Sequence, residues 1–284
     1  MRWQCTVFVN TVTVGSRSIG LSPMGNTRPY TEVHAVAMVD VALLLDSPLS
    51  AGQIKELRST LLNELKEYGF SSLKGRDRAR AEVGLVRRGI ENERTEELHI
   101  HRRFAHLAWY EYRGWTFTRD ATLQRLATIV QWAREGRISV SALGLVFKDV
   151  FVNDDPGSYD IADVFQPENK YLPPIAYGCG GMWEQEFSWF VEDEELEQHG
   201  LYSSLQVEAR VRKPASKGDS ESFVHVTELH HRQQIFFGNK DADPGVEWSE
   251  SAVKHRLDVA HRFNKTLLGE LLSDEMIRRI GLKD

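Results

Sequence analysis

The chain has 284 residues, a net charge of −6 and 41% hydrophobic residues, values typical of a globular protein with a sizeable core. No apolar stretch approaches the roughly 18 residues that a membrane-spanning helix needs, so we expect no membrane partner. Two cysteines are too few for a disulfide framework. Because the N-terminal segment also lacks a basic leader followed by an apolar run, we expect a cytoplasmic protein.

The first clear elements are a strand and a helix. Residues 35–45 are almost continuously apolar, a pattern typical of a central strand covered on both faces. Ser50 and Gln53 then have the spacing of a capping box, which marks a helix start. Apolar residues at spacings of three and four continue to Tyr68, and Gly69 is a typical helix stop.

The middle of the chain predicts strands around another helix. Residues 81–88 and 138–152 have the β-branched and apolar pattern of strands. Residues 99–112 predict one long strand, with the even positions more buried than the odd ones. A helix capped by Thr118 or Asp120 should then pack its apolar stripe on the sheet.

The last third predicts a hairpin and two helices. Residues 203–213 alternate between apolar and polar side chains, and residues 223–237 form the partner strand. From residue 247 the pattern becomes helical, and Ser273 caps a short last helix. The chain therefore predicts an α+β fold with a mostly antiparallel sheet packed by amphipathic helices.

The domain organisation follows from this order. We expect an N-terminal strand and loop at 1–32, a first α+β half at 33–152 and a second at 153–284, packed as one compact unit. The similar order of elements leaves open that the two halves are related, although no residue-level repeat occurs at a fixed period.

Charge is segregated along the chain, which suggests partner-binding surfaces. Seven carboxylates and no Lys or Arg lie between Glu184 and Glu197. A run of this kind is typical of a solvated helix face or of a surface that meets a basic partner. The acidic residues that we expect to bind a partner are Glu192, Asp193, Glu194 and Glu195. The basic ones are Lys74, Arg76, Arg78, Arg80, Arg87 and Arg88.

Candidate chemistry is sparse. The sequence contains no phosphate-binding loop, nucleophile elbow or dinucleotide fingerprint, which predicts no cofactor and favours a protein that is not an enzyme. His99 and His101 would share one face of a strand, a spacing that some metalloenzymes use for two ligands. Arg102 and Arg103 beside them would oppose cation binding. A metal-dependent hydrolase or nuclease using His99 and His101 is therefore an alternative.

Nucleic-acid binding is a second alternative. The basic segment 74–88 could contact phosphates, and the aromatic strand near Trp109 could stack bases. The acidic overall balance argues against it, and aromatic residues in strands more often belong to a core.

The order of elements resembles a family of sporadically distributed, uncharacterised bacterial and archaeal proteins. The resemblance covers most of the chain from residue 33 onward and rests on the early strand and helix at 33–68, Tyr112, Trp115, Phe117, Gly144, Leu145 and the C-terminal helix at 255–281. In that family Gly-Leu is followed by Arg, Tyr and, one further on, Asn, where this chain has Val146, Phe147 and Asp149. The family has no established reaction, so the resemblance implies no active site. Its patchy distribution implies an accessory gene, such as a defence or toxin–antitoxin component.

The leading functional expectation is therefore a binding or accessory protein. It would be a non-catalytic subunit of a prokaryotic, antiviral defence or toxin–antitoxin system, acting through protein–protein contacts. It would also form a homo-oligomer through its sheet and aromatic surface.

Overall fold

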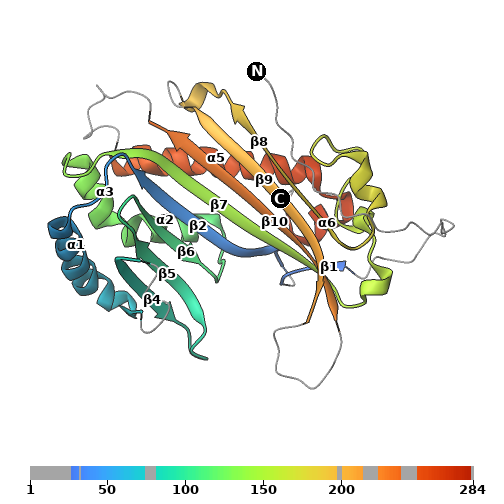
Figure 1. Cartoon of the computed structure of the whole chain (residues 1–284), viewed down its shortest axis with the longest axis horizontal. Helices are drawn as coiled ribbons and strands as arrows, with labels where there is room; N and C mark the ends of the chain where they lie inside the picture. The colour runs from blue at the N-terminus through green and yellow to red at the C-terminus, as the bar shows by residue number, and fades with distance from the viewer. Residues whose placement is uncertain are drawn as a thin grey trace.

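One antiparallel sheet organises the molecule (Figure 1). The computed structural model describes residues 27–31, 33–73, 81–196, 200–213, 223–237 and 248–282. Within them, ten strands form a sheet in the order β3-β4-β5-β6-β2-β7-β10-β9-β8, with β1 paired to β7 off this path. Helices pack on the sheet, which confirms the α+β fold with antiparallel strands.

The strands fall into two groups in chain order. The first group consists of β1 (Thr27–Pro29), β2 (Val36–Leu45), β3 (Phe70–Ser72), β4 (Val83–Arg88), β5 (Arg94–Ile100) and β6 (Phe104–Trp109). The second consists of β7 (Val140–Asn153), β8 (Trp183–Val191), β9 (Leu201–Arg212) and β10 (Val224–Phe236). The pairing of β7 with β10 joins strands from both predicted halves into one sheet. Most of the predicted N-terminal strand and loop lies outside the described residues.

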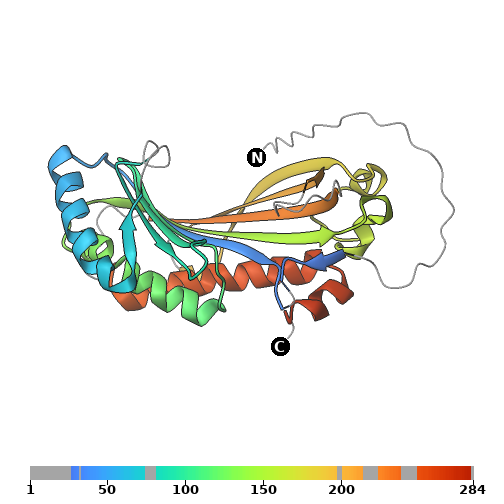
Figure 2. The same cartoon turned by 90° about the horizontal axis from the view of Figure 1, so that it is seen from below.

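The helices lie on one side of the sheet (Figure 2). They are α1 (Ala51–Glu64), α2 (Trp115–Arg125), α3 (Ala127–Arg134), α5 (Glu250–Leu271) and α6 (Asp274–Arg279). Alternate strand residues on that side, such as Val39, Val41 and Leu43 of β2, are fully buried in the core. The opposite face of β2, β7 and β10 carries no helix in this view, and its side chains include half-buried and exposed ones.

Helix α1 begins as its sequence predicts. The Ser50 hydroxyl accepts a hydrogen bond from the Gln53 amide at 3.2 Å, and the Gln53 side chain accepts one from the Ser50 amide at 2.8 Å. A 3-10 turn, Leu65–Tyr68, extends the helix to Gly69, whose φ of 83° is left-handed. The predicted capping box and glycine stop are both confirmed.

We expect Ser50→Ala to lower the free energy of unfolding by about 1 kcal/mol, because it removes an N-cap acceptor. Urea denaturation followed by circular dichroism measures this. Ser47→Ala is the matched control, since Ser47 is also exposed but lies outside the helix cap. Equal midpoints for the two variants would contradict the role of the cap.

The prediction of one long strand at 99–112 is wrong. The chain reverses at Arg102 and Arg103, where the His101 amide donates to the Phe104 carbonyl oxygen at 2.8 Å. Strands β5 and β6 are the two arms of this hairpin. The two-residue connection contains no Gly, Asn or Asp, the residues that usually signal such a turn. The strand-like pattern therefore runs through the turn without a break, and the sequence predicts one strand where there are two.

Two other boundaries also differ. Helix α2 begins at Trp115 after Gly114, whose φ is 93°, so neither Thr118 nor Asp120 is its cap. The acidic segment is not a helix face: Glu184 and Glu186 lie on strand β8, and Glu194–Leu196 forms a 3-10 turn. The predicted strands at 203–213 and 223–237 and the Ser273 cap are confirmed.

Candidate metal centre

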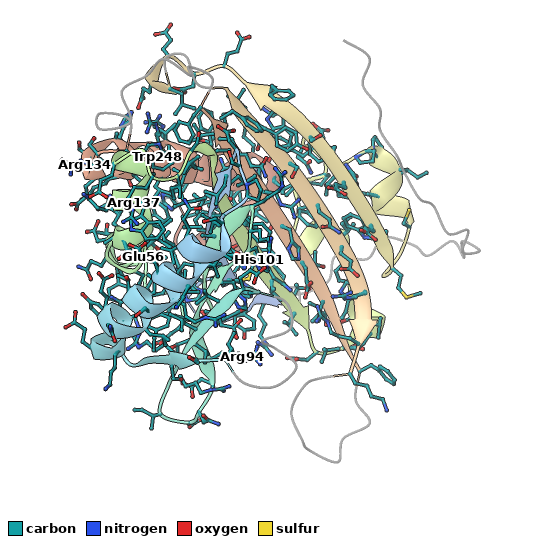
Figure 3. All side chains as sticks on the ribbon, turned by 60° about the vertical axis from the view of Figure 1, so that its left-hand side comes forward. Glu56, Arg94, His101, Arg134, Arg137 and Trp248 are labelled. Atoms are coloured by element: carbon teal, nitrogen blue, oxygen red, sulfur yellow. The ribbon has the colours of Figure 1, made fainter. Side chains whose placement is uncertain are left out.

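The β5–β6 hairpin brings three histidines together on the face of the sheet away from the helices. His99 of β5 lies directly opposite His106 of β6 in the register. His101 follows the end of β5, two residues beyond His99 on the same side of the strand. In Figure 3, His101 lies beside the sheet, apart from Glu56, Arg137, Arg134 and Trp248 near the helices.

The three imidazoles are close and nearly parallel. The ring centroids of His99 and His106 are 5.1 Å apart, and those of His101 and His106 are 5.9 Å apart. One ligand nitrogen from each of the three lies within 4.8 Å of the others. Phe104 stacks on the outer side of His101 at 4.1 Å. The cluster is half-buried and open to solvent.

Carboxylates contact two of the histidines. Asp40 Oδ2 lies 2.8 Å from His106 Nδ1, and Glu97 Oε2 lies 3.4 Å from His99 Nε2. Glu97 also accepts a hydrogen bond from the Tyr110 hydroxyl at 3.1 Å. Carboxylates in this position fix the tautomer and orientation of metal-binding histidines and raise their basicity.

Electrostatics keep two of these imidazoles in the neutral form that binds metal. Burial, and then the neighbouring His106, lower the pKa of His99, while Glu97 acts in the opposite direction. Burial, followed by His106 and His99, lowers the pKa of His101. A neutral imidazole offers a free lone pair at neutral pH, which a cation requires.

The donor set fits a transition metal such as Zn²⁺. Three imidazole nitrogens leave one position of a tetrahedral ion for water, as in catalytic zinc sites. Tetrahedral ligands at about 2.0–2.1 Å from zinc lie about 3.3 Å apart, so the nitrogens must approach by no more than about 1.5 Å. Because Asp40 occupies His106 Nδ1, Nε2 is the nitrogen of His106 that can bind an ion.

The arginines predicted to oppose a cation are partly compensated. Arg102 Nε pairs with Glu82 at 2.9 Å, and Arg103 donates to the Asp46 carbonyl oxygen at 3.4 Å. Glu82 therefore offsets the charge of Arg102, whereas the acceptor of Arg103 is a neutral carbonyl group.

The predicted basic surface is described only in part. Lys74, Arg76, Arg78 and Arg80 lie outside the described residues. Arg87 pairs with the buried Glu96, and Arg88 donates to the Asn92 carbonyl oxygen at 2.8 Å. Trp109 is 2% exposed and donates to Thr122 at 2.9 Å, so it cannot stack bases.

The acidic residues predicted to bind a partner lie at the end of β8 and the turn after it. Glu192 and Glu194 are exposed. Asp193 accepts a hydrogen bond from the Glu195 amide, and Glu195 pairs with Arg262 of α5 at 3.0 Å. These residues lie far from the histidine cluster, because five strands separate β8 from β5 in the sheet.

A second constellation that the sequence pattern did not reveal lies under α5. Ser203 Oγ is 2.7 Å from His231 Nε2, and His231 Nδ1 is 2.7 Å from Asn264 Oδ1. The order of hydroxyl, imidazole and side-chain oxygen is that of a nucleophile, a base and the group that orients the base. Burial lowers the pKa of His231 to about 4. However, Ser203 is 2% exposed, so no substrate reaches it and the relay is a structural network.

An acidic cleft of about 600 Å³ separates α1 from α3. Three of its four carboxylates already have partners: Glu56 pairs with Arg137, Glu64 accepts from Thr128, and Glu135 accepts from Gln131. The histidine cluster is thus the stronger candidate site.

Comparison with known proteins adds no relative: no protein-family model matches the chain, and no curated protein matches it. Within the described residues, no helix is long and apolar enough to cross a membrane.

Proposed function

We propose that the protein is a metal-dependent hydrolase whose ion is held by His99, His101 and His106. The single observation that carries this proposal is the convergence of three imidazole nitrogens within 4.8 Å on the open face of the sheet. When bound, the ion supplies a Lewis acid and a water molecule of lowered pKa.

The remaining chemistry belongs to the side chains of the chain itself. Asp40 Oδ2 holds His106 through Nδ1, which leaves His106 Nε2 as the ligand atom. Asp40 would therefore act on the site through His106, by holding the orientation and tautomer of its ring.

The test is a zinc titration of chelator-treated protein by isothermal calorimetry. We expect one zinc per chain, and loss of at least 100-fold in affinity for His101→Ala, because one of three ligands is removed. His255→Ala, a change at an exposed histidine on α5, is the control. A wild-type protein that binds no zinc would end the proposal.

A binding role through self-association is a second candidate, favoured by one observation. β8 is an edge strand of the sheet, and its Phe190 is 69% exposed. Exposed apolar edge strands pair with other chains. Light scattering after size exclusion tests this: a dimer in the wild type that becomes a monomer in Phe190→Lys supports it, and a wild-type monomer rejects it. The defence or toxin–antitoxin context and the cytoplasmic location remain proposals of the same kind.

A further inference from the structure

The open face of the sheet extends from the histidine cluster to a group of cations. His106 pairs with Ala42 of β2, Ala42 with Gly144 of β7, and Gly144 with Gln234 of β10. Directly paired residues share a face, and so do alternate residues of a strand. Lys148 of β7 and Arg232 of β10 therefore face the same side as the histidines.

Three cations converge there on one buried carboxylate. Glu228 of β10 is 3% exposed. Lys148 Nζ lies 3.0 Å from Glu228 Oε2, Arg210 Nη2 lies 3.2 Å from the same oxygen, and Arg212 pairs with Oε1. Glu208, the other carboxylate of this group, pairs with Arg210.

Two arginines of this group have donors that no described carboxylate accepts. Arg212 Nε is buried without an acceptor in the described part of the chain. Arg232 is exposed and makes no ion pair with any described residue. On β7, β9 and β10, four cations including Arg232 accompany Glu228 and Glu208, and on the neighbouring β8 Glu184 and Glu186 lie opposite Glu208 and Gln206. Each guanidinium offers five donors, so the unused donors of Arg212 and Arg232 are the groups that can contact an anionic ligand.

Aromatic side chains lie on the same face. Tyr202 of β9 pairs with Gln234, and Phe190 of β8 pairs with Tyr202. Phe104 and Phe236 continue this set at the same end of the sheet, since Phe104 pairs with Leu44 and Phe236 with Ala142. Phe104, Phe190 and Phe236 are 38%, 69% and 38% exposed, which leaves their rings accessible.

We propose that this face binds single-stranded nucleic acid and that its phosphodiester is the substrate of the histidine centre. A cationic surface for the backbone combined with accessible aromatic rings for the bases is the usual arrangement for single strands. Three strand spacings separate β6 from β10, which places Arg232 about 15 Å from His106. Glu184 and Glu186 of β8 border the cationic region. In naming the substrate, this inference rests on the proposed function.

The test is fluorescence anisotropy with a labelled single-stranded oligonucleotide of about 12 nucleotides, within the usual site sizes, as RNA and as DNA. The double variant Arg232→Ala/Phe190→Ala changes two exposed residues and spares the buried Glu228 network. We expect it to bind at least tenfold more weakly than the wild type at low salt. The matched control is Arg134→Ala/Phe117→Ala, an exposed arginine and phenylalanine on the helix side, which should bind like the wild type.

The inference would be overturned if the wild type bound no oligonucleotide at about 50 mM salt, where phosphate contacts are strong, or if the control variant lost as much affinity as the double variant. It would also be overturned if polyglutamate, or a duplex of the same length, displaced the labelled strand as well as the unlabelled single strand does. Binding is measured on chelator-treated protein and again with zinc. Oligonucleotide binding by a protein that takes up no zinc would reject the proposed function, and with it the role of the phosphodiester as substrate, but not the binding of single strands to this face. Zinc uptake without oligonucleotide binding would reject only this inference. A preference for RNA or for DNA identifies which of the two nucleic acids supplies the phosphodiester.

Discussion

Replacing His106 with alanine is expected to weaken zinc binding at least 100-fold. The ring centroid of His106 lies 5.1 Å from that of His99 and 5.9 Å from that of His101, so it is close to both other members of the cluster. Two imidazoles alone do not make the three-ligand set that zinc enzymes use. Asp40→Asn should weaken binding by 10–100-fold, the usual loss for a carboxylate that orients a metal-binding histidine.

The measurement is a competition titration against a zinc-sensitive dye. His230→Ala is the matched control, because His230 lies on the same face of the sheet but pairs with Glu228 at 3.6 Å. The structural consequence of each change is followed by thermal denaturation of the zinc-free protein. If zinc binds the His106→Ala and His230→Ala variants equally well, the cluster is not the metal centre.

Replacing Asp149 with asparagine is expected to stabilise the protein strongly at high pH. Asp149 of β7 is 2% exposed, and its Oδ2 has no hydrogen-bond partner among the described residues. Burial raises the pKa of Asp149 to about 7, well above its unfolded value near 3.9. The folded state then binds more protons than the unfolded state between these two values.

The sign of the pH effect follows from linkage. The protonated Asp149 contributes its full share to the free energy of unfolding below about pH 4. This contribution is lost as the pH rises through about 7. At pH 8 the penalty in the wild type is about 4 kcal/mol, from three pKa units at 1.36 kcal/mol each. Asp149→Asn should remove this penalty at pH 8 and change little at pH 4.

Urea denaturation at pH 4, 6 and 8 measures the difference between the two proteins. Burial lowers the pKa of His231 and His261 to about 4, so acid destabilises both proteins through these residues, and the comparison between variants isolates Asp149. Asp154→Asn, at an exposed aspartate that pairs with Arg28 at 3.2 Å, is the control. A free-energy difference between wild type and Asp149→Asn that stays constant with pH would contradict the prediction.

The sequence determined the elements whose signals are local. The capping box at Ser50 and Gln53, the apolar strand 36–45 and the alternating strand ending at Arg212 are readable because each depends on side chains within a few residues of one another. The class of fold follows from these elements, since apolar faces must be covered. The histidine pair at 99 and 101 was visible for the same reason: two residues apart on a strand means one face.

Only the tertiary structure decided the site. The third histidine becomes apparent once the chain reverses at Arg102 and Arg103, because that turn places His106 opposite His99. No breaker residue marks the turn, so hydrophobic pairing of β5 and β6 with the rest of the sheet fixes it. The contacts of Asp40, from a strand 66 positions away from His106, and the convergence on Glu228 depend on strand order. Sequence spacing determines which face a residue occupies, but the order and register of the strands determine which residues meet on that face.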